Sequence, residues 1–322
     1  MRSSGVGLGL LIITGVVGVG SLHAKESGNR QPIAWCYVRE GPLELVRKVV
    51  GRRTSSLSLN RGVLAPVLKT ESKKGKNRAL VRVTDLSTLE PVEGWVDSSQ
   101  TEIIATDRFP SDEELVRQAG SEYREDFTAS KVTVARWLVK QGASGEALVC
   151  FLASLVLPNT RLVAFLPAPE GSLILGPSLE FPFSEMKPAI LSAEVRDLLG
   201  DGIECLITHE PFREGPATSG VNIVIRRLER GSFSSLWVAP LESQNLGFFP
   251  PKVQILQPLE KNAGAPGTVT KAEVEFQRRG KIYIPVWKAT VEFRAVGQEK
   301  PIDSVEVTKA CAWNGSEFEP LR

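Results

Sequence analysis

The chain has 322 residues, of which 42% are hydrophobic and 24% are charged, and its formal net charge is +2. This length and apolar content can bury the cores of two or three domains, which excludes an intrinsically disordered protein. The 39 basic residues nearly balance the 37 acidic ones. No basic run is interleaved with aromatic residues, so we expect no nucleic-acid partner.

The first 24 residues have the pattern of a secretory signal peptide. Arg2 supplies a positive charge, residues 5–20 are apolar or glycine except for Thr14, and Ala24 is a small residue at the expected cleavage point. An uncleaved membrane anchor is the alternative, although six glycines in the segment lower its helix propensity. The sequence therefore predicts a secreted or periplasmic protein with no stable membrane span after cleavage.

Four cysteines follow this segment, at positions 36, 150, 205 and 311. In an oxidising compartment an even number of cysteines is compatible with disulfides. Cys150 and Cys205 both lie in apolar, strand-like runs, so a bridge between them and two free buried thiols are equally open interpretations. Zinc is a poor interpretation, because no two cysteines are close in sequence and His209 is the only histidine after residue 24.

Residues 33–105 contain five short strand-like runs with tight turns, which is enough for a small barrel. Five features recur in order: Leu45 with Arg47, Ser55 with Ser56, Leu59 with Gly62, Val81 with Val83, and the closing Gly94-Trp95-Val96. In order and spacing they resemble the bacterial SH3-type (SH3b) family. The resemblance implies an SH3-like barrel that engages a cell-wall peptide or glycan, or an envelope protein. The long basic loop at 73–78 and the absence of an aromatic residue before the valine strand depart from the family.

Two sets of residues are candidates for ligand binding on this barrel. Trp95 could offer an aromatic platform, but a tryptophan at the start of a barrel strand more often packs into the core, and the sequence favours that position. Lys73, Lys74 and Arg78, in the basic loop, could contact an acidic polymer. A solvated hairpin loop is the more ordinary interpretation of the same charges.

Residues 106–131 separate two β-rich parts and contain the best helical pattern of the chain. Ser111 and Glu114 form a capping-box pattern, which predicts a helix over 111–119. Gly120 stands where a helix end is expected. We interpret the segment as a helical connector.

The second part is also rich in β-structure, so the chain belongs to the mainly β class. We expect a β-rich domain over 132–249, a Pro/Gly-rich linking segment over 250–271 and a C-terminal antiparallel subdomain over 272–322. The predicted architecture is a sandwich or a partial propeller. The predicted strands cover 132–139, 147–155, 161–166, 172–175, 190–195, 204–209, 221–227, 233–238, 272–277, 286–293 and 303–311.

The region around 190–240, with its Asp-rich turn and following hairpin, resembles the FG-GAP and VCBS-type repeats of exported propeller proteins. In those repeats the turn often binds calcium through carboxylate oxygens. Asp197 and Asp201 occupy the first and fifth positions of such a loop, but Leu199 offers only a backbone carbonyl and Glu204 comes one residue early. A turn whose aspartates cap backbone N–H groups is favoured, and no cofactor is predicted.

Signatures of catalysis are absent from the sequence: there is no nucleophile elbow, phosphate loop, dinucleotide fingerprint or His-Glu-x-x-His motif. The sequence therefore predicts a non-catalytic, exported binding protein of the bacterial cell envelope. The alternative is a carboxylate- or calcium-assisted hydrolase in the second domain. Its acids would be those nearest the turn: Asp197, Asp201, Glu204 and Glu210.

Overall fold

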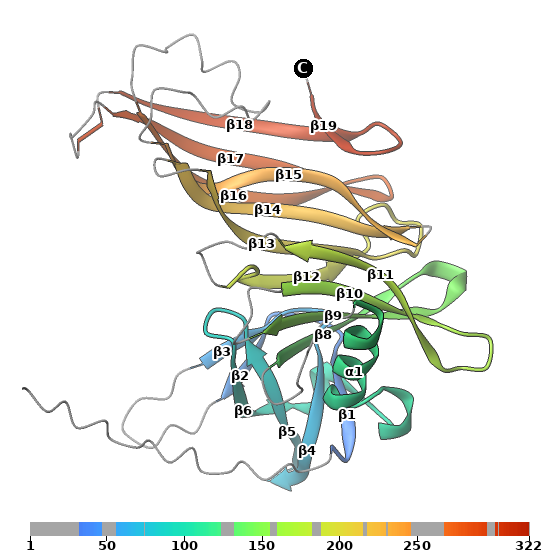
Figure 1. Ribbon diagram of the computed structural model, residues 1–322. Helices are drawn as coiled ribbons and strands as arrows, with labels where there is room; N and C mark the ends of the chain where they lie inside the picture. Colours follow the sequence, from blue (N-terminus) through green and yellow to red (C-terminus); the bar gives the residue numbers. More distant parts are fainter. Residues whose placement is uncertain are drawn as a thin grey trace, which may run out of the picture. The chain divides into compact units, whose positions relative to one another are not determined.

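Three antiparallel sheets make up most of the chain, as the mainly β composition predicts (Figure 1). The computed structural model describes residues 32–46, 56–73, 75–123, 132–154, 160–181, 188–214, 218–229, 231–245, 267–294, 300–301 and 303–321. The predicted signal segment at 1–24, Lys74, residues 124–131 of the connector and residues 250–266 of the linking segment lie outside these ranges.

The first sheet has seven strands in the order β3-β2-β6-β5-β4-β1-β7. Short hairpin turns join several neighbours, as the Gly- and Ser-rich punctuation of the sequence predicts. A short 3-10 turn, η1 (Ser98–Gln100), leads into β7. The strands are β1 (Ala34–Val38), β2 (Leu43–Val46), β3 (Ser56–Leu59), β4 (Leu64–Lys73), β5 (Lys76–Asp85), β6 (Glu90–Asp97) and β7 (Thr101–Ile104).

One face of this sheet encloses a core of its own. Buried side chains from six strands, β1 to β6, gather in one cluster, with Leu45, Val81 and Val96 among them. Such a cluster requires a strongly curled sheet. The sheet nevertheless stays open, because its end strands β3 and β7 each pair with a single neighbour. Where the sequence predicts a small barrel, the structure thus has a strongly curled sheet that does not close.

The second sheet is buried on both faces. Its order is β11-β10-β9-β8, and in β9 every residue from Ala147 to Ala153 is at most 1% exposed. Leu148 and Cys150 face one core, while Val149 and Phe151 face another. An uninterrupted apolar run is typical of such two-sided burial. The strands are β8 (Val132–Lys140), β9 (Glu146–Ser154), β10 (Thr160–Pro167) and β11 (Leu173–Phe181), with the 3-10 turn η4 (Gly142–Ser144) between β8 and β9.

A helix and the first strand cover one face of this second sheet. Helix α1 (Asp112–Tyr123) follows the 3-10 turn η2 (Thr106–Arg108), and it begins where the sequence predicts, with the N–H of Glu114 donating to Ser111 Oγ at 3.2 Å. It runs through Gly120, because a single glycine costs a helix only about 1 kcal/mol. Its buried Leu115 and Val116 pack in the same core as Trp35 of β1. The predicted connector thus forms part of a core.

The third sheet is a meander of eight strands in chain order, β12 to β19. It contains all the strands predicted beyond residue 190. The pairing of β15 with β16 is restricted to residues 242–245 and 268–271, so the sheet divides into two leaves beyond that corner. Its strands are β12 (Ser192–Arg196), β13 (Cys205–Glu214), β14 (Thr218–Glu229), β15 (Ser232–Asn245), β16 (Gly267–Arg279), β17 (Ile282–Arg294), β18 (Asp303–Trp313) and β19 (Phe318–Pro320).

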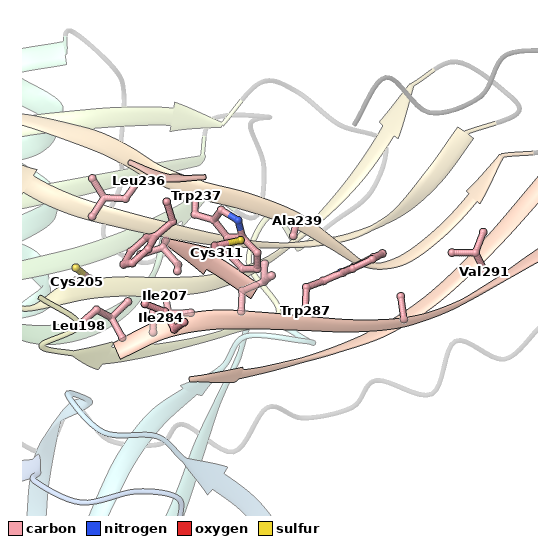
Figure 2. Packing of buried hydrophobic residues seen from close by; sticks show 14 of the residues in the cluster. Leu198, Cys205, Ile207, Leu236, Trp237, Ala239, Ile284, Trp287, Val291 and Cys311 are labelled. Atoms are coloured by element: carbon pink, nitrogen blue, oxygen red, sulfur yellow. The ribbon is translucent and has the colours of Figure 1, made fainter. Parts of the chain in front are cut away.

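A core lies between these two leaves, which gives the sandwich that the sequence allowed. Leu236 and Trp237 of β15 pack in one cluster with Trp287 and Val291 of β17 (Figure 2). The Trp287 ring is fully buried, and its Nε1 donates a hydrogen bond of 2.7 Å to the Pro240 carbonyl across the core. Trp287 therefore contributes both apolar burial and a directional bond between the leaves.

Replacement of Trp287 by Phe is expected to lower the free energy of unfolding by about 2–4 kcal/mol, because it leaves the Pro240 carbonyl unpaired and a filled core short of volume. Urea denaturation followed by circular dichroism measures the loss. Trp313→Phe is the matched control, since Trp313 lies half-buried at the border of the same cluster beside Phe318. Equal losses in the two variants would contradict this role for Trp287.

The cores run across the predicted domain boundaries. Tyr37 and Leu64 of the first sheet pack with Leu148 of the second, and Val195 of the third packs with Val149 of the second. Residues 32–322 accordingly group into one unit. Within the described part of the chain, none of the helices has the length and apolar character that a membrane crossing needs.

Candidate functional site

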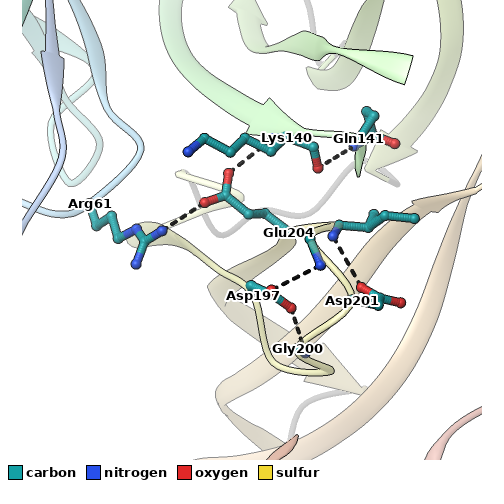
Figure 3. Close-up of polar contacts among 9 residues, drawn as sticks. Arg61, Lys140, Gln141, Asp197, Gly200, Asp201 and Glu204 are labelled. Carbon is teal, nitrogen blue, oxygen red and sulfur yellow. Dashed lines mark hydrogen bonds and ion pairs between the residues drawn. The ribbon is translucent and has the colours of Figure 1, made fainter. Parts of the chain in front are cut away.

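The predicted Asp-rich turn lies between β12 and β13 (Figure 3). Asp197 accepts hydrogen bonds from the N–H groups of Gly200 at 2.7 Å and Gly202 at 3.0 Å, and Asp201 accepts one from Ile203 at 3.0 Å. The other oxygen of Asp201 pairs with Arg227 at 2.7 Å. The aspartates thus cap backbone N–H groups, as the turn interpretation predicts.

Glycine is required within this turn. Gly200 has φ +67°, and a Cβ built on it would lie 2.3 Å from the Lys281 carbonyl oxygen. The turn therefore packs tightly against the β16–β17 connection, where the Tyr283 N–H also donates to the Leu198 carbonyl at 2.7 Å. These contacts give the turn a structural role inside the third sheet.

Glu204, the third predicted acid, does not join the aspartates. Its side chain is 2% exposed and accepts from Arg61 Nη2 at 2.8 Å and from the Lys140 N–H at 2.9 Å. Among the described residues, no three His, Cys, Asp or Glu side chains are grouped to hold a metal ion. The acids that a calcium loop or a hydrolase would require therefore point in different directions in this region.

Glu204 instead joins all three sheets. Arg61 belongs to the loop before β4, Lys140 ends β8, and Glu204 precedes β13. Backbone bonds reinforce the joint: the N–H of Glu204 donates to the Lys140 carbonyl at 2.9 Å and the N–H of Val195 to the Arg61 carbonyl at 3.0 Å. Burial and the nearby Glu204 carboxylate raise the pKa of Tyr37 to about 12. A buried carboxylate needs such partners, because desolvation penalises an unpaired charge.

Replacement of Glu204 by Gln is expected to lower the free energy of unfolding by about 1–3 kcal/mol. Removal of the carboxylate charge leaves the Arg61 guanidinium, which is part-exposed and screened, without its partner. Glu93→Gln is the control, because Glu93 pairs with Arg82 at the surface. Chemical denaturation should show a change below about 0.5 kcal/mol for that control. A Glu204→Gln variant as stable as the control would be inconsistent with the joint.

The four cysteines are free thiols, and all four are buried. Cys150 packs between β9 and the helix, whereas Cys205 lies in the core of the third sheet. Of the two interpretations left open by the sequence, the structure has the free buried thiols and no Cys150–Cys205 bridge, because these two thiols belong to different cores. Burial raises the pKa of both thiols to about 12 and that of Cys36 and Cys311 to about 11. Thiols held in the neutral form are weak nucleophiles.

Native protein is accordingly expected to react with Ellman's reagent at pH 8 far more slowly than the unfolded chain, because all four thiols are inaccessible and un-ionised. Addition of guanidinium chloride should release four thiol equivalents per chain. Stoichiometric fast labelling of the native protein would contradict this expectation, and fewer than four equivalents after unfolding would reveal a disulfide.

Trp95 lies on the outer face of the first sheet. Its neighbours Gly94 and Val96 are buried, and Val96 points into the core, so alternation turns the indole outward, where it is half-buried. The favoured core position is therefore wrong. Cross-strand partners of Trp95 are Val46 of β2, which is 55% exposed, and Leu80 of β5. Together they form an apolar row, which we call the Trp95 face.

Charged residues surround the Trp95 face. Arg78 of β5 is exposed and lies opposite Asp97 of β6. This pair is two residues along the strands from Leu80 and Trp95, so both pairs lie on the same face. A hydrogen bond from the Ser99 N–H, with further help from Lys76 and Arg78, lowers the pKa of Asp97. The backbone of Lys73, at the hairpin end of the neighbouring strand, lies opposite Lys76. The structure thus brings Arg78 close to Trp95 and places Lys73 at the tip of the hairpin.

A cleft that the sequence did not reveal lies where the three sheets meet. It has a volume of ≈ 330 Å³ and is lined by residues 57–59 of β3, 132–137 of β8 and 191–193 at the start of β12. Each of these strands stands at an edge of its sheet. The buried Arg136 guanidinium, which lies 4.9 Å from the Trp35 ring centroid, forms an ion pair with Asp112 at one wall.

His209, the residue that a triad would require, lies within β13. It is half-buried, and burial lowers its pKa. Its neighbours Thr208 and Glu210 bind Arg226 of β14 instead, in a part-buried network that joins the two strands. The histidine is therefore a strand residue, and its neighbours Thr208 and Glu210 connect β13 to β14.

No family model, no curated protein and no solved structure matches this chain. The resemblances to SH3-type domains and to FG-GAP or VCBS-type repeats therefore stay predictions.

Proposed function

We propose that this protein is an exported, non-catalytic binding protein of the bacterial cell envelope, and that the Trp95 face is its ligand-binding surface. The observation that carries the proposal is the outward position of Trp95 between Val46 and Leu80. A large side chain that is only partly buried on a sheet face gains less from packing than a fully buried one, so its position favours a role at the surface.

The composition of the face suits a binding site. Binding energy at interfaces concentrates in a few aromatic and arginine residues, surrounded by a polar rim. Trp95 and Arg78 provide the first element, and Asp97, Glu93 and Lys69 supply charged groups around them. An indole face stacks well on apolar faces of sugars or on peptide side chains, so peptidoglycan offers both kinds of ligand.

Two further observations support the proposal: one favours a non-catalytic role, and the other favours export from the cell. The acids near the predicted turn are engaged with backbone N–H groups and arginines, and the thiols are buried and un-ionised. The signal-peptide pattern at 1–24 supports export, with the mature chain starting near residue 25.

The test is co-sedimentation of the mature chain, residues 25–322, with isolated peptidoglycan. Trp95→Ala should weaken binding at least about tenfold, because truncation of an aromatic anchor removes a large share of the interface energy. Ile174→Ala is the control, since Ile174 is also apolar and 51% exposed but lies on β11 of another sheet. A wild-type chain that stays in the supernatant, or equal binding by both variants, would sink the proposal.

The full mature chain is needed for this test. Deletion of residues 33–105 would strip Trp35 and Tyr37 from the core they share with helix α1 and β9, and would remove the Arg61 partner of Glu204. Loss of binding by such a truncated chain would report unfolding, whereas a surface substitution at Trp95 leaves both cores intact.

A further inference from the structure

The cleft between the three sheets is bounded in part by strands that lie at the edges of their sheets. A strand at a sheet edge has one row of backbone N–H and C=O groups without a neighbour in its own sheet. Three such strands, β3, β8 and β12, form part of the walls of this cleft, and the central strand β5 adds residues 82–85. Its volume of ≈ 330 Å³ falls at the lower end of the range of roughly 300–1,000 Å³ that is usual for ligand sites.

The direction of the backbone groups of β8 follows from its contacts. The N–H of Leu138 donates to the Gly62 carbonyl at 2.9 Å, and the carbonyl of Val134 accepts from Thr84 Oγ1 at 2.8 Å, so both point away from β9 toward the first sheet. Backbone groups of alternate residues in an antiparallel pair point to the same side. The N–H groups of Val134 and Arg136, which line the cleft, are therefore directed toward it.

The same argument applies to β12. The N–H of Val195 donates to the Arg61 carbonyl at 3.0 Å, and the carbonyl of Ala193 accepts from Asn60 Nδ2 at 3.2 Å. Ala193 also lines the cleft, so its N–H points toward it. The cleft thus faces two N–H donors on one strand, roughly 6.8 Å apart, and a third on another strand.

Two arginines and two aspartates line the cleft, namely Arg82, Arg136, Asp85 and Asp112, so the lining carries no net charge. Arg82 pairs with Glu93 at 2.7 Å, Arg136 pairs with Asp112, and Asp85 accepts hydrogen bonds from the N–H and hydroxyl of Ser87. A charged ligand would have to break one of these pairs, and desolvation of its own charge would add to the cost. The charge balance therefore favours an uncharged ligand.

We propose that this cleft binds an extended, uncharged polypeptide segment, whose carbonyl oxygens accept hydrogen bonds from the N–H groups of β8 that point into the cleft. The carbonyl oxygens of an extended chain recur on one side at the spacing of the Val134 and Arg136 N–H groups, which is the basis of recognition by strand addition. The cleft has room for a few residues, so the bound segment is short.

This site differs from the Trp95 face and does not rest on the proposed function. The two adjoin, because Arg82 lines the cleft and lies two residues along β5 from Leu80 of the Trp95 face. Their tests separate them: Trp95→Ala should leave peptide binding in the cleft unchanged, and substitutions at Val134 should leave sedimentation with peptidoglycan unchanged.

The experiment is a titration of the isotope-labelled mature chain with a set of end-blocked pentapeptides built from Ala, Ser, Thr, Val, Leu and Asn. Amide resonances and hydrogen exchange are read at Val134, Arg136 and Ala193. We expect members of the set to shift these amides and to slow their exchange with solvent. Failure of every pentapeptide to do so at roughly 1 mM would overturn the proposal, since weaker binding than that carries no function.

Two variants test the backbone contact itself. Val134→Pro removes the N–H that points to the cleft, and an edge strand tolerates proline where this N–H does not pair with the neighbouring strand of its own sheet. Val134→Ala loses the side chain but keeps the N–H. Peptide affinity should be about five- to tenfold lower in Val134→Pro than in Val134→Ala, as expected for one lost hydrogen bond.

Two outcomes would argue against a peptide strand. Equal peptide affinity in the two Val134 variants would show that the donor is not used. Shifts of the same three amides that depend on protein concentration, without peptide, would identify a second copy of this chain as the occupant. The comparison requires that Val134→Pro unfolds within a few degrees of the thermal midpoint of Val134→Ala. If it does not, the amide shifts and hydrogen exchange of the wild-type chain provide the test.

Discussion

The buried carboxylate of Glu204 fixes the arrangement on which both proposed binding sites depend. It is held by Arg61 from the first sheet and by the Lys140 N–H from the second, and it belongs to the third. A carboxylate taken out of water is tolerable only with such partners. Because the three partners come from three sheets, the charge penalises any arrangement that separates them. Gly62 shows the same constraint: it has φ +92°, and a Cβ there would lie 2.4 Å from Val195 Cγ2.

The second sheet explains why the other two sheets pack so closely. A sheet buried on both faces needs two covers. Trp35 and helix α1 supply one, and Val195 with Leu206 supplies the other. Each fully buried Val, Leu or Phe side chain of β9 adds roughly 1.5–3 kcal/mol relative to exposure, so neither cover is dispensable. The covers come from helix α1 and from the first and third sheets, so all three sheets meet around the second one.

The sequence predicts the positions of the strands and the helix well, but not which side of a sheet faces the core or which distant residues are in contact. Each strand predicted beyond residue 131 lies within or overlaps an observed strand, and the capping pattern at Ser111 located the helix. These features depend on local periodicity and on local hydrogen bonds. Trp95 shows the limit: a period of two says that Trp95 and Val96 face opposite sides, but not which side is the core. Glu204 shows it too, since its partners lie 143 and 64 residues away. The sequence signal that could have found the joint is Asn60-Arg61-Gly62, which lies within the predicted barrel at 33–105.

The cleft is a consequence of how the sheets meet. Three edges come together, and cross-sheet bonds satisfy some of their groups: Leu138 with Gly62, Val195 with Arg61, and Ala193 with Asn60. Between these points β8 and the first sheet do not form a continuous ladder. A single bridge, Val63 to Trp137, links them there. Edge groups that point into a confined space cannot recruit another chain as freely as an open edge, which protects the protein from aggregation. The same confinement makes the site selective, since a ligand must be narrow, extended and uncharged to enter. A barrel that closed on itself would have removed the β3 edge and this cleft wall with it, so the open sheet is what makes the site available.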